Sequence, residues 1–210
     1  MKILEVKTLV FPELKVIRYY RFCDERGYFT ETLRESDFHK VIPDFQIKQV
    51  NESHSKKNTV RGLHFQWNPY MGKLVRTVHG HMVDLFLDIR TGSPTYGKIA
   101  AYDLPASYDL DYNEWIWIPV GFAHGNYYLE NSTIEYFCTG EYNPTCEVGI
   151  SPFGEDVDWS LCEEKLKEQF EQLKKEQFII SDKDKQGLTI EDWNHDERSK
   201  YFNYNQLKQR

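Results

Sequence analysis

The sequence predicts an all-β protein with antiparallel strands, built as a β-sandwich, jelly roll or barrel, followed by one longer amphipathic helix. Short segments rich in β-branched and aromatic residues recur between residues 45 and 150, separated by Gly, Pro and Asn turn signals. No helical segment lies between these strands, as the crossovers of a parallel sheet would require. The 14 Tyr and 13 Phe residues also favour strands over a helical bundle.

The chain begins with alternating apolar and charged residues, which predict strands over residues 3–6 and 15–20 and a turn at Pro12. A short helix is expected to start at Ser36 or Asp37 and to end before Pro43. Further strands are then expected at residues 45–51, 74–78, 81–89, 114–118, 123–129 and 133–138.

The pattern changes after residue 159. Residues 160–163 read Ser-Leu-Cys-Glu, a capping-box pattern, and Leu166, Phe170 and Leu173 follow at helical spacing. We therefore predict a helix over residues 160–178, with its apolar stripe on the β core and exposed ion pairs Glu163/Lys167 and Glu171/Lys175. A polar tail is expected up to Arg210. Because no internal repeat or linker is present, residues 1–210 are predicted to form one domain.

Composition excludes several classes of function. The net charge is −7 and the cations are interspersed with Asp and Glu, which argues against a nucleic-acid or membrane surface. No apolar run approaches the roughly 20 residues of a membrane helix. The N-terminus is expected to be a strand and not a signal peptide. The four cysteines are far apart, without a C-x-x-C pair, so we expect a reduced, cytoplasmic protein.

Residues 59–66, followed by Lys73, place polar side chains among strand-forming apolar ones, as expected where a sheet faces a ligand. If strict alternation holds, Arg61 and Leu63 share one face while His64 and Gln66 share the other. A single His in such a strand is more often structural. The other polar residues of the chain decide its role.

Three kinds of site fit these residues. His79 and His81, with His64 and His124 from neighbouring strands, would form a metal centre, although a turn is expected at Gly80 and no Glu completes the ligand set. A metal-free enzyme would use His64 as a base, supported by a carboxylate, and a Tyr as the acid on the facing strand. A non-catalytic sugar-binding domain would explain the aromatic residues alone.

A series of motifs between roughly residues 15 and 150 resembles the dTDP-4-dehydrorhamnose 3,5-epimerase family. In order, these motifs are Arg26–Glu31, Gln49–Asn51, Val60–Gln66, Gly72–Arg76, Asp88–Arg90 with Ser93–Thr95, Pro119–Gly125, Tyr136 with Tyr142, and Glu147–Ile150. The resemblance implies a cupin-type jelly roll, a homodimer, no metal or redox cofactor, and a nucleoside-diphosphate 4-keto-6-deoxy sugar as substrate.

The resemblance also implies roles for individual residues. By position, His64 resembles the general base, Asp184 its carboxylate partner with Asp182 as the substitute, and Tyr136 the general acid. Lys73 resembles the group that stabilises the enolate oxygen at C4.

The remaining positions match network and substrate contacts. Asp84 belongs to the network of Lys73. Sugar and diphosphate contacts are matched by Arg61, His124, Gln49 and Asn51. In the family, one segment contributes to the active site of the neighbouring subunit, and this segment is matched here by Arg26, Phe29 and Glu31. Tyr142 resembles an aromatic residue that borders the nucleotide.

Three features depart from the family pattern. Asn126 follows Gly125 where the family more often has an aromatic or aliphatic residue, a change expected to alter the pocket near Tyr136. Residues 151–155 replace the usual acidic-proline segment and the helix over residues 160–178 is longer than usual, both where the preference for nucleotide base and sugar is decided. We expect an epimerase acting at C3 and C5, or at C3 alone, of a dTDP-linked sugar in deoxysugar or surface-polysaccharide synthesis. GDP- or CDP-linked sugars, heptoses included, are the alternative substrates.

Overall fold

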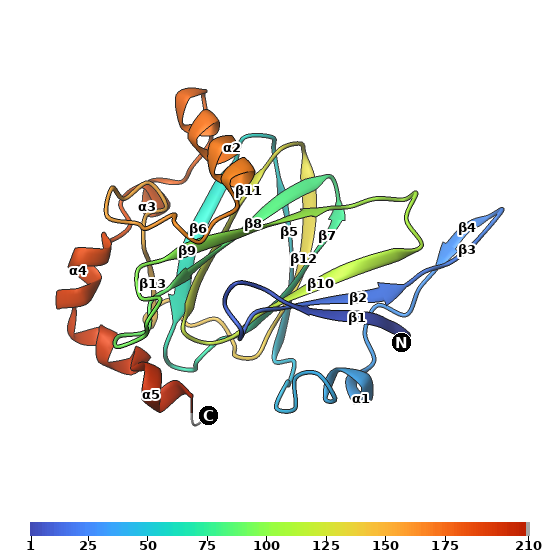
Figure 1. Cartoon of the computed structure of the whole chain (residues 1–210), viewed down its shortest axis with the longest axis horizontal. Helices are drawn as coiled ribbons and strands as arrows, with labels where there is room; N and C mark the ends of the chain where they lie inside the picture. Colours follow the sequence, from blue (N-terminus) through green and yellow to red (C-terminus); the bar gives the residue numbers. More distant parts are fainter. Residues whose placement is uncertain (209–210) are drawn as a thin grey trace.

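Two antiparallel β-sheets pack face to face in the computed structural model, which describes residues 1–208 (Figure 1). The larger sheet has the order β1 (Ile3–Thr8), β2 (Lys15–Tyr20), β10 (Tyr112–Ile118), β7 (Lys73–His79), β12 (Ser132–Cys138) and β5 (Gln49–Ser55). The smaller has the order β13 (Glu147–Gly149), β6 (Val60–Gln66), β11 (Phe122–Tyr128), β8 (His81–Asp88) and β9 (Ile99–Pro105). A separate hairpin, β3 (Phe22–Asp24) and β4 (Gly27–Phe29), extends away from the sheets (Figure 1). The predicted all-β class is confirmed.

Three apolar clusters hold these layers together. Residues of both sheets, such as Val75, Phe86 and Ile116, fill the space between them. A second cluster lies on the outer face of the five-stranded sheet, beneath the C-terminal helices. A third, around Trp115, covers the outer face of the six-stranded sheet. Strand alternation therefore divides each sheet between an inner and an outer core.

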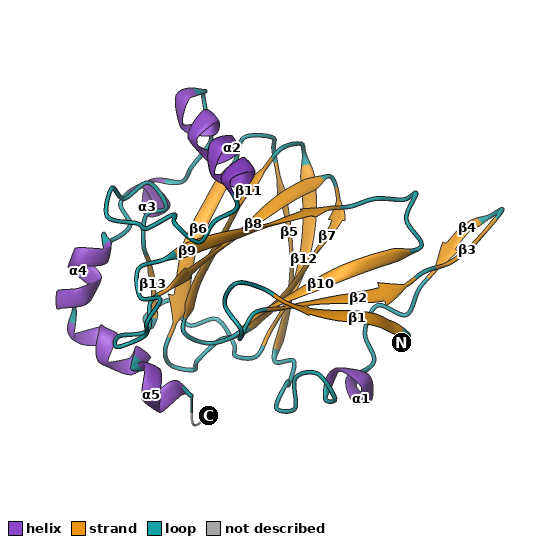
Figure 2. Ribbon diagram, viewed as in Figure 1, coloured by secondary structure: helices purple, strands orange, loops and turns teal. Residues whose placement is uncertain are grey.

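The helices lie outside the sheets (Figure 2). They are α1 (Glu35–Phe38), α2 (Glu164–Lys175), α3 (Asp182–Lys185), α4 (Ile190–His195), the 3₁₀ helix η1 (Glu197–Phe202) and α5 (Tyr204–Leu207). The apolar stripe predicted for α2 is confirmed, because Leu166, Phe170 and Leu173 are all buried in the outer cluster of the five-stranded sheet. No helix among residues 1–208 is long and apolar enough to cross a bilayer.

Several details of α2 were predicted wrongly. The helix starts at Glu164, and its N-cap Glu163 makes no side-chain capping bond, so the capping box at Ser160 does not form. The backbone N–H of Ser160 instead donates to Asp158 Oδ1 (2.8 Å), which keeps residues 158–160 in a turn. The observed ion pairs join Glu164 with Lys167 and Glu171 with Lys174, so one partner of each pair differs by one residue from the prediction and the spacing is i,i+3.

Other boundaries also differ from the predictions. The strand expected over residues 45–51 begins at Gln49, because Phe45 turns away to pack beside α1. The short helix α1 ends at Phe38, before the predicted boundary at Pro43. Strand β9 was not predicted. The expected polar tail forms helices instead, since Trp193 and Phe202 bury their rings against Phe65. Residues 209 and 210 of that tail lie outside the described part of the chain.

Candidate active site

A polar cavity opens between the two sheets. Strands β5, β7 and β12 of one sheet and β6 and β11 of the other contribute its walls, and α3 closes one side. The lining residues are Ser53, Arg61, Gly62, His64, Lys73, His124, Gly125, Asn126, Ile134, Tyr136 and Asp184. Most of the predicted catalytic residues therefore meet here, although they are spread over more than one hundred positions of the chain.

A β-bulge in β6 directs two polar side chains into this cavity. Opposite β11, His64 pairs with His124 but Arg61 pairs with Asn126, so β6 carries one extra residue. Gly62 makes the bulge possible, because its φ is +92° and a Cβ there would lie 2.6 Å from the His124 carbonyl oxygen. Strict alternation was therefore a wrong prediction: Arg61 and His64 both face the cavity.

The other two residues of that prediction have structural roles. Leu63 packs in the outer core of the five-stranded sheet. Gln66 is buried, and its amide donates to the carbonyl oxygens of Pro69 and Glu141.

His64 is hydrogen-bonded to Asp184, with 2.7 Å between Nε2 and Oδ1. Helix α3 positions this carboxylate: the Ser181 side chain caps the helix by accepting from the Asp184 N–H, and the Gly62 N–H donates to Asp184 Oδ2 (3.2 Å). Burial raises the pKa of the Asp184 carboxyl, but the hydrogen bond and positive charge of His64 outweigh it and hold that pKa below its ordinary value. Asp182, the substitute considered from the sequence, is exposed.

Lys73, His124 and Asp84 form a buried chain of polar groups. His124 Nε2 lies 2.7 Å from Asp84 Oδ1, and Lys73 Nζ lies 3.5 Å from His124 Nδ1. Since the carboxylate accepts at Nε2, Nδ1 carries the lone pair and accepts from the ammonium. Burial lowers the pKa of the Lys73 ammonium, and nearby negative groups, Asp84 among them, offset this only in part. Burial likewise lowers the pKa of His124 despite Asp84.

Tyr136 enters the cavity from β12, on the sheet that faces β6 and His64. Burial raises the pKa of its phenol, while the Arg61 guanidinium acts in the opposite direction. The phenol is therefore protonated at neutral pH and can donate a proton. An imidazole and a phenol thus reach one cavity from facing sheets, with an ammonium in the same cavity.

The predicted sugar and diphosphate contacts are divided: Arg61 and His124 line the cavity, His124 as a buried residue, whereas Gln49 and Asn51 do not line it. Arg61 is exposed, and its guanidinium is oriented by Ser55 Oγ (2.8 Å) and the His54 carbonyl (3.3 Å). Gln49 donates to Asn51 Oδ1 (2.9 Å) and accepts from the Tyr142 N–H (2.8 Å). The cavity lining does not include Gln49, Asn51 or Tyr142, and the Tyr142 side chain is half exposed.

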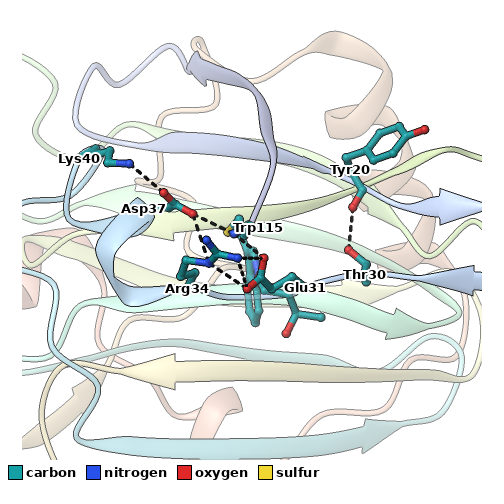
Figure 3. Close-up of polar contacts among 9 residues, drawn as sticks. Tyr20, Thr30, Glu31, Arg34, Asp37, Lys40 and Trp115 are labelled. Carbon is teal, nitrogen blue, oxygen red and sulfur yellow. Dashed lines mark hydrogen bonds and ion pairs between the residues drawn. The ribbon is translucent and has the colours of Figure 1, made fainter.

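The structure does not bring Arg26, Phe29 or Glu31 to the cavity of their own chain. Arg26 lies on the projecting hairpin, paired with Asp24 (2.6 Å), and Phe29 is 70% exposed. Glu31 binds Arg34 and the terminal amino group beside α1 (Figure 3), and it is not among the residues that line the cavity.

Glu147 also contacts the site. It belongs to the motif Glu147–Ile150, but no role was predicted for it. Strand β13 sets it beside β6, where Oε1 lies 3.8 Å from His64 Nδ1 and Oε2 is ion-paired with Lys183. Its side chain is only 13% exposed. The pairing of β13 with β6 brings the two residues together, and no local pattern in the sequence indicates that pairing.

Of the four histidines proposed for a metal site, His64 and His124 line the cavity, but His79 and His81 do not join them. His81 Nε2 is bonded to Asp103, outside the cavity, and His79 is exposed. Within residues 1–208, no three His, Cys, Asp or Glu side chains are arranged to hold a metal ion.

Comparison with known proteins gives the same family throughout. A sequence model described as dTDP-4-dehydrorhamnose 3,5-epimerase matches residues 8–192. The enzyme of that name from Sinorhizobium fredii is 42% identical over 147 residues, which cover 69% of this chain and 73% of the relative. Its Pseudomonas aeruginosa counterpart is 31% identical over 194 residues, or 90% and 97% of the two chains.

Solved structures agree. The Mycobacterium tuberculosis epimerase has a TM-score of 0.80 and 31% identity, covering 98% of this chain and 97% of its own. The Legionella pneumophila epimerase, solved in complex with dTDP-4-keto-L-rhamnose, has a TM-score of 0.78 and 30% identity, covering 95% and 97%.

Fold, cavity and relatives together define the class of the protein, which is an epimerase, an isomerase built on a cupin-type jelly roll. The chain belongs to the dTDP-4-dehydrorhamnose 3,5-epimerase family.

Proposed function

We propose that the protein inverts C3 and C5 of a nucleoside-diphosphate 4-keto-6-deoxy sugar, of the dTDP-4-dehydro-6-deoxyglucose type. The observation that carries this proposal is the convergence of His64, Tyr136 and Lys73 in one cavity, with the first two on facing sheets. Inversion needs a base on one face of a carbon and an acid on the other. We also propose that the protein is cytoplasmic and acts in deoxysugar or surface-polysaccharide synthesis.

The C4 ketone makes the chemistry feasible, because it acidifies the hydrogens on C3 and C5. His64 takes the proton of the C–H bond, and the electron pair of that bond delocalises onto the C4 oxygen as an enolate. Lys73 stabilises this developing negative charge. The enolate collapses to the ketone as Tyr136 delivers a proton to the opposite face of the carbon. Asp184 holds the imidazole in place and stabilises the imidazolium.

No step of this sequence requires a redox cofactor or a metal ion. Arg61, at the mouth, offers a planar cation to the diphosphate. The alternatives in substrate are inversion at C3 alone and a GDP- or CDP-linked sugar such as a heptose.

The experiment that tests the function is deuterium exchange. The protein is incubated in D₂O with 4-keto-6-deoxy sugars carried on dTDP, GDP and CDP, and label at C3 and C5 is followed by NMR. We expect label at both carbons with the dTDP sugar. Label at C3 alone would identify a 3-epimerase. Exchange at neither carbon, whichever nucleotide carries the sugar, would refute the proposed epimerase activity.

We further propose that the protein is a homodimer in which the hairpin of one subunit completes the cavity of the other. The exposed Phe29 and the projecting β3–β4 hairpin support this proposal, because neither Arg26, Phe29 nor Glu31 lines the cavity of its own chain. Arg26 would then add a second cation for the diphosphate.

Mixing inactive variants tests this arrangement. His64→Ala and Arg26→Ala subunits, each poorly active alone, are expected to regain activity when refolded together, because one site of the mixed dimer has both wild-type residues. A mixture of His64→Ala with His64→Ala,Arg26→Ala subunits serves as the control and should stay inactive. If the first mixture gains nothing while sedimentation shows mixed dimers, each subunit uses its own hairpin.

A further inference from the structure

The floor of the cavity includes an amide that the proposed mechanism does not use. Asn126 follows His124 by two positions on β11, so both side chains point into the space between the sheets. In the pairing of β11 with β8, Asn126 lies directly opposite Asp84. The side chains of such a cross-strand pair are neighbours. Asn126 therefore lines the cavity, and the Asp84 carboxylate lies beside it, buried outside the lining.

Both groups carry a buried oxygen without a partner. Asn126 is 4% exposed and Asp84 is fully buried. Within the described part of the chain, neither Asn126 Oδ1 nor Asp84 Oδ2 has a hydrogen-bond partner, although Asp84 Oδ1 is bonded to His124. Buried polar atoms in native proteins are nearly always satisfied, because an unpaired one retains its full desolvation penalty. Asn126 lines the cavity, so the donor that its Oδ1 lacks can come from what fills the cavity.

Through Asp84 and His124, this pair is connected to Lys73, which the proposed mechanism places at the C4 oxygen of the substrate. His124 links Asp84 to Lys73 through contacts of 2.7 and 3.5 Å. With the C4 oxygen at Lys73, the groups nearest to the floor are the substituents on C3 and C5. This placement rests on the proposed function.

We infer that Asn126 is a specificity-determining residue, which binds a hydroxyl group on a carbon next to the C4 carbonyl. The hydroxyl proton of the substrate can donate to Asn126 Oδ1. A methyl group in the same position would leave this oxygen unpaired. Two positions supply the hydroxyl: C3 of the ring, and a hydroxylated exocyclic chain on C5.

Three dTDP-linked 4-keto sugars separate these sources: the 6-deoxy sugar, its 3-deoxy analogue, and its 6-hydroxy analogue. The protein is assayed as wild type, as Asn126→Leu, which keeps the shape of the amide without its polar atoms, and as Ile134→Val, a control on the same cavity wall. The readout is kcat/KM for deuterium uptake at C5. Thermal unfolding checks that each variant is folded.

If the C3 hydroxyl is bound, wild type should use the 6-deoxy sugar about tenfold to a hundredfold better than the 3-deoxy analogue, and Asn126→Leu should lose this preference. If the exocyclic hydroxyl is bound, the preference should be for the 6-hydroxy sugar, and the same variant should lose it. Ile134→Val should keep the preference of the wild type in either case.

Equal use of all three sugars by the wild type, or an equal loss on all three in Asn126→Leu, would overturn the inference and leave the epimerase function standing. The wild-type comparison decides the matter even if the Leu variant fails to fold. Absence of exchange with every sugar in the wild type would overturn the inference together with the proposed function.

Discussion

Replacing His64 with alanine is expected to lower deuterium uptake at both C3 and C5 by about 10²- to 10⁴-fold, the usual contribution of a positioned acid–base group. The effect falls on both carbons because one imidazole, held by Asp184 at 2.7 Å, is the base for each. NMR of the 4-keto sugar in D₂O measures the two rates separately.

The matched control is His195→Ala, which removes an exposed imidazole on α4 whose Nδ1 lies 2.9 Å from the Glu191 carbonyl oxygen of the same helix, away from the cavity lining. This variant should exchange at the wild-type rate. Wild-type exchange in His64→Ala, or loss at only one of the two carbons, would contradict the role given to His64.

The second large effect is expected in Tyr136→Phe, which should lose about 10²- to 10⁴-fold in turnover while retaining more of the deuterium uptake. Without the phenolic proton, His64 can still remove a hydrogen and return a deuteron to the same face, so label enters without inversion. Product formation and label uptake, measured in one reaction, separate the two steps.

Tyr108→Phe provides the comparison for this variant. Tyr108 is 59% exposed in the loop after β9, and its hydroxyl donates weakly to the Val78 carbonyl (3.4 Å). Both rates should be unchanged. An equal fall in turnover and uptake in Tyr136→Phe would mean that the phenol is needed for proton removal, and the assignment of acid and base would have to be revised.

Much of the fold follows from local sequence patterns. Strands β7, β8, β11 and β12 were predicted to within two residues, because each is a run of β-branched and aromatic residues between turn signals. The apolar stripe of α2 was also predicted, since a period of 3.6 is a strong signal. The C-terminal helices were missed because Trp193 and Phe202 lie far apart in a polar segment, and only their packing on Phe65 makes that segment regular.

The geometry of the site could be predicted from local sequence patterns only in part. The bulge at Gly62 adds a residue to β6, and alternation cannot anticipate an inserted residue. The Asp184 carboxylate reaches His64 across 120 positions, and only the resemblance to a family pointed to it. Glu147 and the unpartnered oxygens of Asp84 and Asn126 depend on how strands pair, which the sequence alone does not indicate.

The central claim is that His64 and Tyr136 face each other across a carbonyl-activated sugar ring. The most direct measurement is a crystal structure with a nucleotide sugar whose C4 ketone has been reduced to an alcohol, which binds but cannot form the enolate. We expect the ring between the imidazole and the phenol, with its C4 oxygen within hydrogen-bond distance of Lys73 Nζ. A ring bound outside this cavity, or with both side chains on one of its faces, would contradict the account.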